Sequence, residues 1–147
     1  RKLNIETIEA YQIDKLYFNK IKYGGDITLE NGTVISNNEL TFDPIPAKSY
    51  AYCSDTMYDE SIIPIIENAN YLYHESTFLE NESHLAEKTM HSTAKQAATI
   101  AQKAKVQNLI LGHFSTRYGN TDFFQNEAKT IFENVYLAED GKEFELS

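Results

Sequence analysis

Cysteine is nearly absent from this sequence: Cys53 is the only one in 147 residues. A single cysteine excludes an intrachain disulfide and a cysteine-rich zinc site, and it suits a reducing cytoplasm. Long hydrophobic runs are also absent, and none approaches the roughly 20 residues that span a bilayer. The N-terminus is too polar for a secretory signal. We therefore expect a cytoplasmic chain with no membrane partner.

Positive charge is scarce as well. The 13 Lys and Arg residues face 22 Asp and Glu, which gives a net charge of −9 and a pI near 4.8. Phosphate binding depends largely on neutralisation by Lys and Arg, so a surface that attracts nucleic acid everywhere is excluded and only a local basic patch remains. The hydrophobic content of 41% is typical of one globular domain with its own core, so we expect a single domain over residues 1–147. Because the chain begins at Arg1 without an initiator methionine, we expect a fragment or a processed product.

Within that domain, residues 1–48 are predicted to form a helical and hairpin insert. Asn4 is suited to cap one short helix, and Asp14 to cap a second. The β-prone runs on either side of Asn31-Gly32 predict a hairpin. Residues 37–48 are expected to form a loop with one irregular strand, because Asn and Pro interrupt the pattern there.

Residues 49–147 are predicted to form an α/β core, because strand patterns alternate with helix patterns. A helix at residues 93–104 has an alanine-rich face that can pack closely on a sheet, and Thr93 and Gln96 have the spacing of a capping box. The other expected elements are strands at residues 50–53, 71–74, 109–111 and 135–138, helices at 61–67 and 122–132, and a turn at 140–141 that leads into 143–146.

Polar side chains stand where the expected strands end. Asp55 follows the first strand, His74 and Glu75 stand at the tip of the second, and His113 follows the third. His91 opens the long helix. If these strands are neighbours, the side chains gather at one edge of the sheet, which is where ligands bind in open α/β sheets.

These residue types suit several chemistries. Aspartate and histidine are ligands for Zn²⁺, and a carboxylate can bridge two metal ions. A histidine beside a carboxylate can relay protons, and a helix N-terminus offers amide donors to a phosphate. Since no His-x-His pair occurs, two ligands alone do not build a two-metal centre. Structural roles stay open for each residue: a turn for Asp55, a hydrogen-bonded position for His74 and His113, a helix cap for His91, and a solvated surface for His84.

Four motifs resemble, in order and separation, those of the ribonuclease Z family, the tRNA 3′-processing endoribonucleases of the metallo-β-lactamase superfamily. In the second motif, Ser76 stands where the family usually has alanine. The family's His-x-His-x-Asp-His motif and a further histidine ligand lie upstream of this region. The resemblance therefore implies an α/β chain that forms the C-terminal half of a metallo-β-lactamase-like αββα sandwich. The motifs are Ser54-Asp55-Thr56, His74-Glu75-Ser76-Thr77-Phe78, His91-Ser92-Thr93 and Leu111-Gly112-His113-Phe114-Ser115-Thr116-Arg117-Tyr118.

The same resemblance implies an activity and roles for single residues. The complete protein would remove the 3′ trailer of precursor tRNA with two Zn²⁺ ions in its active site, and would act as a homodimer. This chain would supply one part of that site, its partner being the N-terminal half of the same protein, and we expect the chain alone to be inactive. The implied roles are metal binding for Asp55 and His113, catalysis for His91 and its acidic partner Glu75, and substrate binding for Ser92, Thr93 and Arg117, the last by contacting phosphate or bracing the site.

Two other functions fit the sequence. One is a phosphodiesterase or other hydrolase of the same fold that acts on small molecules. The other is an inactive half-domain that pairs with another chain. Cleavage of precursor tRNA at one defined position separates the first from ribonuclease Z, and the mass of the chain in solution tests the second.

Overall fold

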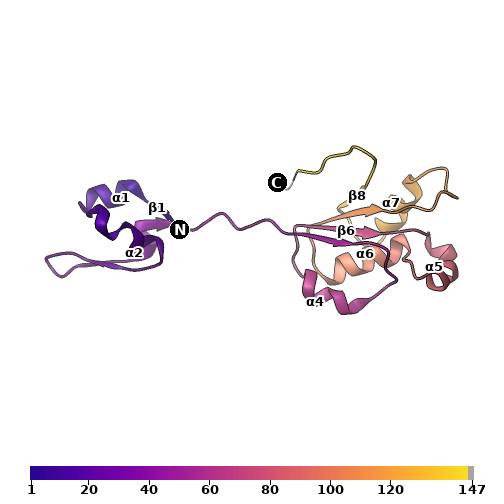
Figure 1. Ribbon diagram of the computed structural model, residues 1–147, viewed down its shortest axis with the longest axis horizontal. Helices are drawn as coiled ribbons and strands as arrows, with labels where there is room; N and C mark the ends of the chain where they lie inside the picture. The colour runs from indigo at the N-terminus through magenta and orange to yellow at the C-terminus, as the bar shows by residue number, and fades with distance from the viewer. Residues whose placement is uncertain (146–147) are drawn as a thin grey trace. The chain divides into compact units, whose positions relative to one another are not determined.

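The computed structural model describes residues 1–145 and divides into two compact units, the first of residues 1–47 and the second from Lys48 onward (Figure 1). Each unit has its own cluster of buried apolar side chains. In the part of the chain that the structure describes, no helix has both the length and the apolar character needed to cross a membrane.

The first unit combines short helices with two small antiparallel sheets, in which β1 pairs with β4 and β2 with β3. Its core consists of aliphatic side chains, among which Ile21 and Leu40 are fully buried. Its elements are β1 (Lys2–Leu3), α1 (Ile5–Ala10), the 3₁₀ helix η1 (Lys15–Tyr17), α2 (Phe18–Lys22), β2 (Ile27–Thr28), β3 (Val34–Ile35), α3 (Asn37–Leu40) and β4 (Thr41–Phe42).

The helix caps and the hairpin that the sequence predicts in this unit are confirmed. The side chain of Asn4 caps α1, and Asp14 Oδ1 accepts a hydrogen bond from Leu16 N at 2.8 Å. The expectation of a loop after residue 37 was wrong in part, because α3 forms there. Asn37 is a weak helix former, but its buried amide donates to Ile21 O at 2.6 Å, and this tertiary contact stabilises the turn.

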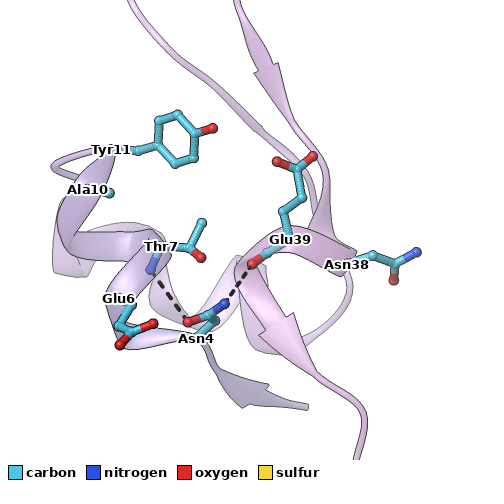
Figure 2. Close-up of a pocket in the computed structure, with 7 residues that line it drawn as sticks. All are labelled: Asn4, Glu6, Thr7, Ala10, Tyr11, Asn38 and Glu39. Carbon is cyan, nitrogen blue, oxygen red and sulfur yellow. Dashed lines mark hydrogen bonds between the residues drawn. The ribbon is translucent and has the colours of Figure 1, made fainter.

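A pocket of about 560 Å³ lies beside α1 and α3. Figure 2 shows Asn4 between the two helices: its side chain accepts from Thr7 N at 3.5 Å and donates to Glu39 O at 3.3 Å. The pocket is lined mostly by polar side chains, together with Ala10 and Tyr11. It belongs to the first unit and contains none of the motif residues.

The second unit is built on a four-stranded sheet in which all strands are parallel, in the order β5 (Tyr50–Cys53), β6 (Tyr71–Glu75), β7 (Asn108–Gly112) and β8 (Val135–Leu137). The register places Cys53 beside His74, and His74 beside Leu111. Parallel neighbours require crossover connections, and helices supply them here. These are η2 (Glu60–Ile62), α4 (Ile63–Ile66), η3 (Glu80–Glu82), α5 (Ser83–Thr89), α6 (Ala94–Lys103) and α7 (Asp122–Ala128).

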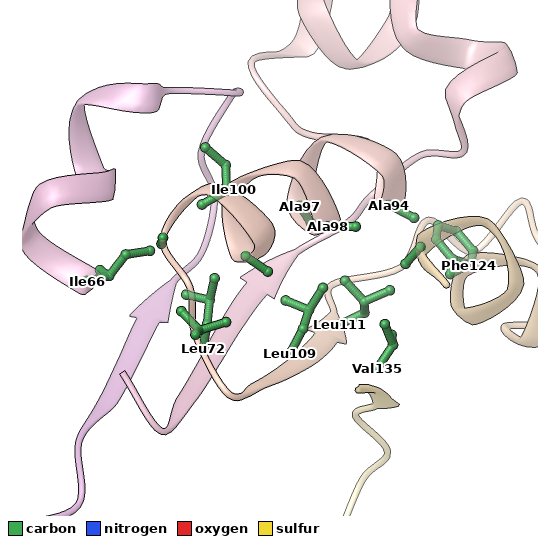
Figure 3. Close-up of a cluster of buried hydrophobic side chains, with 14 of the residues drawn as sticks. Ile66, Leu72, Ala94, Ala97, Ala98, Ile100, Leu109, Leu111, Phe124 and Val135 are labelled. Carbon is green, nitrogen blue, oxygen red and sulfur yellow. The ribbon is translucent and has the colours of Figure 1, made fainter. Parts of the chain in front are cut away.

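One face of this sheet carries the core. Leu72, Leu109 and Leu111 are fully buried on it, and the alanines of α6 pack against them (Figure 3). Alanine brings a helix backbone close to a sheet, which explains the small-residue face of α6. Figure 1 shows α4 and α6 on the same side of the sheet.

The other face of the sheet is rich in tyrosine. Tyr52 and Tyr73 stack with ring centroids 4.6 Å apart, and Tyr52 is 65% exposed. Tyr71 is buried on this face, and its hydroxyl donates to Glu145 O at 3.2 Å. Side chains alternate along a strand, so the apolar core face and this tyrosine-rich face are distinct surfaces.

Most elements expected in this unit are present. The capping box of Thr93 and Gln96 begins α6, while the helix predicted to reach residue 132 ends at Ala128. The sequence did not predict α5. Residues 143–145 form no strand, and Leu146, the end of that expected segment, lies outside the described residues.

Candidate active site

The motif residues meet at the carboxyl edge of the parallel sheet. Asp55 follows β5, Glu75 ends β6 and His113 follows β7, and these three strands are neighbours. The loop before α6 brings His91 to the same edge, where its ring centroid lies 5.2 Å from that of His113. The expected gathering of polar groups at the strand tips is therefore observed for Asp55, Glu75, His91 and His113, but not for His74, which is buried on the core face of the sheet.

Two of these residues have left-handed backbone conformations. Asp55 has φ 49° and His113 has φ 60°, and Met90, directly before His91, has φ 63°. Asp and His adopt this region more readily than most residues other than glycine. Backbone strain of this kind clusters at functional sites, where it directs a side chain. At each of these three positions the backbone leaves regular secondary structure, next to the place where the motif side chains face one another.

Asp55, His91 and His113 form a group that could hold a metal ion. Each offers one ligand atom, and these atoms all lie within 4.8 Å of one another. His113 Nε2 is 3.1 Å from Asp55 Oδ1. The sequence assigned metal binding to Asp55 and His113 alone, and the structure brings His91 into the same group.

The carboxylate of Glu75 is the centre of a dense hydrogen-bond network. It is fully buried and accepts five hydrogen bonds, from His91 Nδ1 at 2.7 Å, Thr56 N at 3.0 Å, Thr77 N at 3.1 Å, Thr77 Oγ1 at 2.8 Å and Ser92 N at 3.2 Å. Burial raises the pKa of Glu75, but the hydrogen bonds from His91, Thr77 and Ser92 outweigh it and hold the pKa below its usual value. The carboxylate is therefore kept ionised at neutral pH.

This network sets the tautomer of His91. An ionised carboxylate only accepts hydrogen bonds, so His91 Nδ1–H donates to Glu75. The other ring nitrogen, Nε2, is left to exchange a proton or bind an ion. The side chain of His91 is 23% exposed, so it reaches solvent on one side while Glu75 holds it on the other.

A second relay orients His113. Thr77 Oγ1 donates its hydrogen to Glu75, so it accepts from His113 Nδ1–H at 2.8 Å. In the neutral ring this tautomer leaves the lone pair on Nε2, which lies 3.1 Å from Asp55 Oδ1. A cation between them satisfies both atoms, and neutral histidine oriented by a second hydrogen bond is the usual form of a metal ligand. Since Asp and His suit zinc, and a catalytic zinc generally has about three protein ligands, the donor set fits that ion.

Ser92 and Thr93 are fully buried, and their hydroxyl groups bind other parts of the protein. Ser92 Oγ donates to Thr56 O at 2.8 Å, and Thr93 Oγ1 donates to Glu80 Oε2 at 2.8 Å. The first amides of α6 are also engaged: those of residues 93–96 donate to Gln96 Oε1, Phe78 O, Glu127 Oε1 and Thr93 Oγ1. The expectation that this helix end offers free amide donors to a phosphate is wrong, because protein acceptors occupy all four.

Arg117, Tyr118 and Glu82 form a set of contacts, called the clamp below, that joins the loop after β7 to η3. Arg117 Nη1 donates to Glu82 Oε1 at 3.0 Å, and its guanidinium lies 5.1 Å from the centre of the Phe78 ring. Tyr118 donates its hydroxyl hydrogen to Glu82 and accepts a hydrogen bond from Leu79 N at 3.1 Å. The sequence left open whether Arg117 contacts phosphate or braces the site, and these contacts favour bracing.

His74 and Cys53 lie outside the group formed by Asp55, His91 and His113. His74 is fully buried on the core face, its Nδ1 lies 2.7 Å from Glu75 O, and its Nε2 has no hydrogen-bond partner among the described residues. Burial lowers the pKa of His74, so it is neutral when folded. The thiol of Cys53 is half-buried, and burial raises its pKa, which makes it a poor nucleophile.

Sequence reasoning missed Thr77, Glu82 and Tyr118 as parts of this arrangement. Thr77 and Tyr118 lie inside the quoted motifs, so their place beside the ligands was a signal. Glu82 lies in a run of polar residues, and nothing in the sequence connects it to Arg117, which is 35 positions away.

Comparison with protein-family models gives no match. Curated relatives named ribonuclease Z do match: that of Parabacteroides distasonis is 46% identical over 92% of this chain, and that of Phocaeicola vulgatus is 44% identical over 90%. The chain spans 45% and 43% of the lengths of these two relatives.

Two solved structures match the fold of this chain. The metallo-β-lactamase fold protein YhfI from Bacillus subtilis is 31% identical, with a TM-score of 0.63 over 67% of this chain and 40% of its own. Human tRNase Z, short form, matches 78% of this chain and 36% of its own with a TM-score of 0.52, and at 23% identity it supports the fold alone.

The parallel sheet, the helices on its core face and the site at its carboxyl edge define a protein of the metallo-β-lactamase class. Within that class, the chain belongs to the ribonuclease Z family. The family inferred from the four motifs is confirmed, and so is the α/β fold as part of a metallo-β-lactamase-like sandwich.

Proposed function

We propose that this chain is the C-terminal half of a metal-dependent endoribonuclease that removes the 3′ trailer of precursor tRNA. One observation carries the proposal: His91 is held by the buried Glu75 carboxylate beside the ligand atoms of Asp55 and His113. A proton donor next to a metal site is what hydrolysis of a phosphodiester requires. The relatives named ribonuclease Z support the substrate.

Asp55 and His113 would hold metal on this side of an active site that takes two Zn²⁺ ions. The other ligands would come from the N-terminal half of the same protein. Bound zinc supplies an activated water at neutral pH and neutralises charge on the phosphate. Because His91 is the proton donor in this proposal, only Asp55 and His113 of the group are metal ligands, and we expect the chain alone to bind zinc weakly and to be inactive.

The chain's own residues account for the departure of the leaving group. A product with a 3′-hydroxyl on the tRNA requires the bond between phosphorus and the 3′-oxygen to break, with the phosphate remaining on the trailer. His91 Nε2 gives a proton to that 3′-oxygen as the bond breaks. Glu75 keeps Nδ1–H directed at itself, which orients the ring and stabilises the charged imidazolium, as a buried aspartate does in serine proteases.

Substrate contacts, location and assembly complete the proposal. Arg117 would brace the loop that carries His113 and lie near the phosphates, and Ser92 and Thr93 would fix the loop that carries His91. Because the composition is acidic, we expect most tRNA contacts to lie in the N-terminal half or in the second subunit of a homodimer. The single thiol, Cys53, is consistent with the cytoplasm.

The test is cleavage of a precursor tRNA by the complete protein, native and with Asp55→Ala. We expect cut product at one defined position with native protein and its loss with Asp55→Ala, together with a lower zinc content. Asp140→Ala, at an exposed turn outside the site, serves as the matched control and should behave as native. Unchanged processing by Asp55→Ala would refute the assignment, and cleavage at scattered positions would favour a less specific phosphodiesterase.

A further inference from the structure

A second cavity begins at His91 and is not accounted for by metal binding or proton transfer. Its volume is about 360 Å³, which is near the lower end of the range for small-molecule sites. It is lined by side chains from α5, from the N-terminal part of α6 and from the segment after β5, among them His84, Glu87, His91, Gln96, Met57 and Tyr58.

His91 is the residue shared by this cavity and the candidate metal group of Asp55, His91 and His113. The cavity therefore starts at the proton donor and extends past residues that are not metal ligands. In the proposed reaction, the atom that receives the proton is the 3′-oxygen of the last nucleotide that stays on the tRNA. The ribose and base that carry this oxygen must lie directly beside His91.

The side chains that line the cavity match a nucleoside better than a phosphate. Among the described residues, no Lys or Arg lines the cavity, and Glu87 adds negative charge. A phosphate group is therefore disfavoured. Met57 and Tyr58 offer a polarizable and an aromatic surface against which a base can stack. Gln96 Oε1 is bound to Thr93 N at 2.9 Å, which leaves the amide hydrogens of Gln96 for the edge of a base.

We propose that this cavity binds the nucleoside on the tRNA side of the scissile phosphate, the one whose 3′-oxygen leaves. The inference rests on the proposed function for the choice of nucleoside, but the cavity and its chemistry stand without it. Tyr58 contributes the stacking surface, and its hydroxyl is directed to Glu60, so the ring is fixed in place. The site then selects a nucleotide with an intact base next to the bond that breaks.

Adenosine is a direct probe, because its free 3′-hydroxyl mimics the end of the tRNA product. In the present chain labelled with ¹⁵N, adenosine should shift the amide signals around Met57, Tyr58, His84 and Glu87. Inorganic phosphate should leave these signals in place. Tyr58→Leu and, as a variant at a more exposed position, Met57→Ala should each weaken adenosine binding, by about tenfold for Tyr58→Leu, given the usual contribution of base stacking.

Lys88→Ala is the matched control, because it lies on α5 but does not line the cavity. It should bind adenosine as the native chain does. Adenosine shifts that map elsewhere, or that persist unchanged in both Tyr58→Leu and Met57→Ala, would overturn the proposal. This part of the test uses no catalysis, so it is decided even if the complete protein does not process tRNA.

The complete protein supplies the second part of the test. A precursor tRNA that lacks the base of the last retained nucleotide should be cleaved with kcat/KM about tenfold lower than the intact substrate. In Tyr58→Leu the missing base should cause little further loss, because the two changes remove the same contact. Equal cleavage of both substrates by native protein would contradict the cavity's role while leaving the proposed function intact.

Discussion

Glu75 connects more of the site than any other residue, because its carboxylate contacts His91 directly and His113 through Thr77. Burial alone would favour the neutral acid, and the hydrogen bonds reverse this. Removing a buried charge that several donors stabilise leaves those donors without their acceptor. Its loss would therefore change both the orientation of His91 and the electrostatics around it. The chemistry of the proposed reaction depends on this residue although it does not touch the substrate.

Glu75→Gln in the complete protein keeps the shape of the side chain but removes the charge. We expect kcat to fall by about 10²–10⁴-fold, the usual range for lost acid–base catalysis, with KM nearly unchanged. The pH–rate profile should change as well, because the side chain that accepts from His91 Nδ1–H is no longer an ionisable carboxylate. Glu67→Gln, in an exposed pair with Lys105, is the control. A native pH–rate profile in Glu75→Gln would show that the carboxylate has no role in proton transfer.

His74 and Glu75 make the folded state sensitive to acid. The pKa of each is lower in the folded state than its ordinary value, near 6.5 for His and 4.5 for Glu. A lowered folded pKa contributes stability that is complete above the unfolded pKa and is lost as the pH falls towards the folded pKa. We expect urea unfolding to show falling stability below about pH 6.5, first from His74 and then from Glu75.

The variant His74→Leu separates these two contributions. It should remove the part of the pH dependence that lies just below pH 6.5 and leave the part at carboxylate pH values. A native-like pH dependence in His74→Leu would show that His74 is not the group that titrates on unfolding.

At the scale of elements, the loops after β6 and β7 act as one unit. Ser115 N donates to Thr77 O at 3.1 Å, and Glu82 binds both Arg117 and Tyr118 from the neighbouring connection. The same loops carry Thr77 and His113, so their mutual position sets the orientation of a candidate metal ligand. The clamp therefore lies outside the reacting group but controls its geometry.

Tyr118→Phe removes one hydroxyl from this clamp. We expect the free energy of unfolding to fall by about 1 kcal/mol, as for a typical hydrogen bond, and the amide of Leu79 to exchange faster with solvent. Tyr136→Phe, on the exposed side of the sheet, should change neither quantity. Native exchange at Leu79 in Tyr118→Phe would mean that the clamp does not hold these loops together.

How much the sequence predicts differs between elements. The capping box of α6 and the apolar strand before His113 are local patterns, and the structure has both. The helix α5 was missed because its polar sequence has little local signal, and its left-handed C-cap is Met90, over which His91 N donates to Ala86 O at 2.8 Å. Glu82 could not be assigned because its partners, Arg117 and Tyr118, are distant in sequence.

At the scale of the whole molecule, the second unit has a candidate metal-binding group at one edge of its sheet and a tyrosine-rich face on that sheet. The motifs predicted that Asp55, Glu75, His91 and His113 would meet, because parallel strands bring their ends together. The hydrogen bond from Lys95 N to Glu127 could not be foreseen, since it depends on how α7 packs on α6. The roles of the motif residues in binding and catalysis stay predictions.

The isolated chain offers a direct test of the divided site. Calorimetric titration with Zn²⁺ should show weak binding, and His113→Ala should weaken it further, because this chain supplies only Asp55 and His113 as metal ligands. His84→Ala, a histidine outside the group, is the control. Tight binding of two zinc ions together with turnover would show that the chain does not need the N-terminal half.

The central claim is that His91 gives a proton to the leaving 3′-oxygen. It is tested most directly by His91→Ala in the complete protein, with a precursor tRNA in which sulfur replaces that oxygen, because a thiolate leaves without a proton. We predict a loss of about 10²–10⁴-fold with oxygen and a much smaller loss with sulfur. An equal loss with both substrates would contradict the account and would favour a role for His91 as a metal ligand.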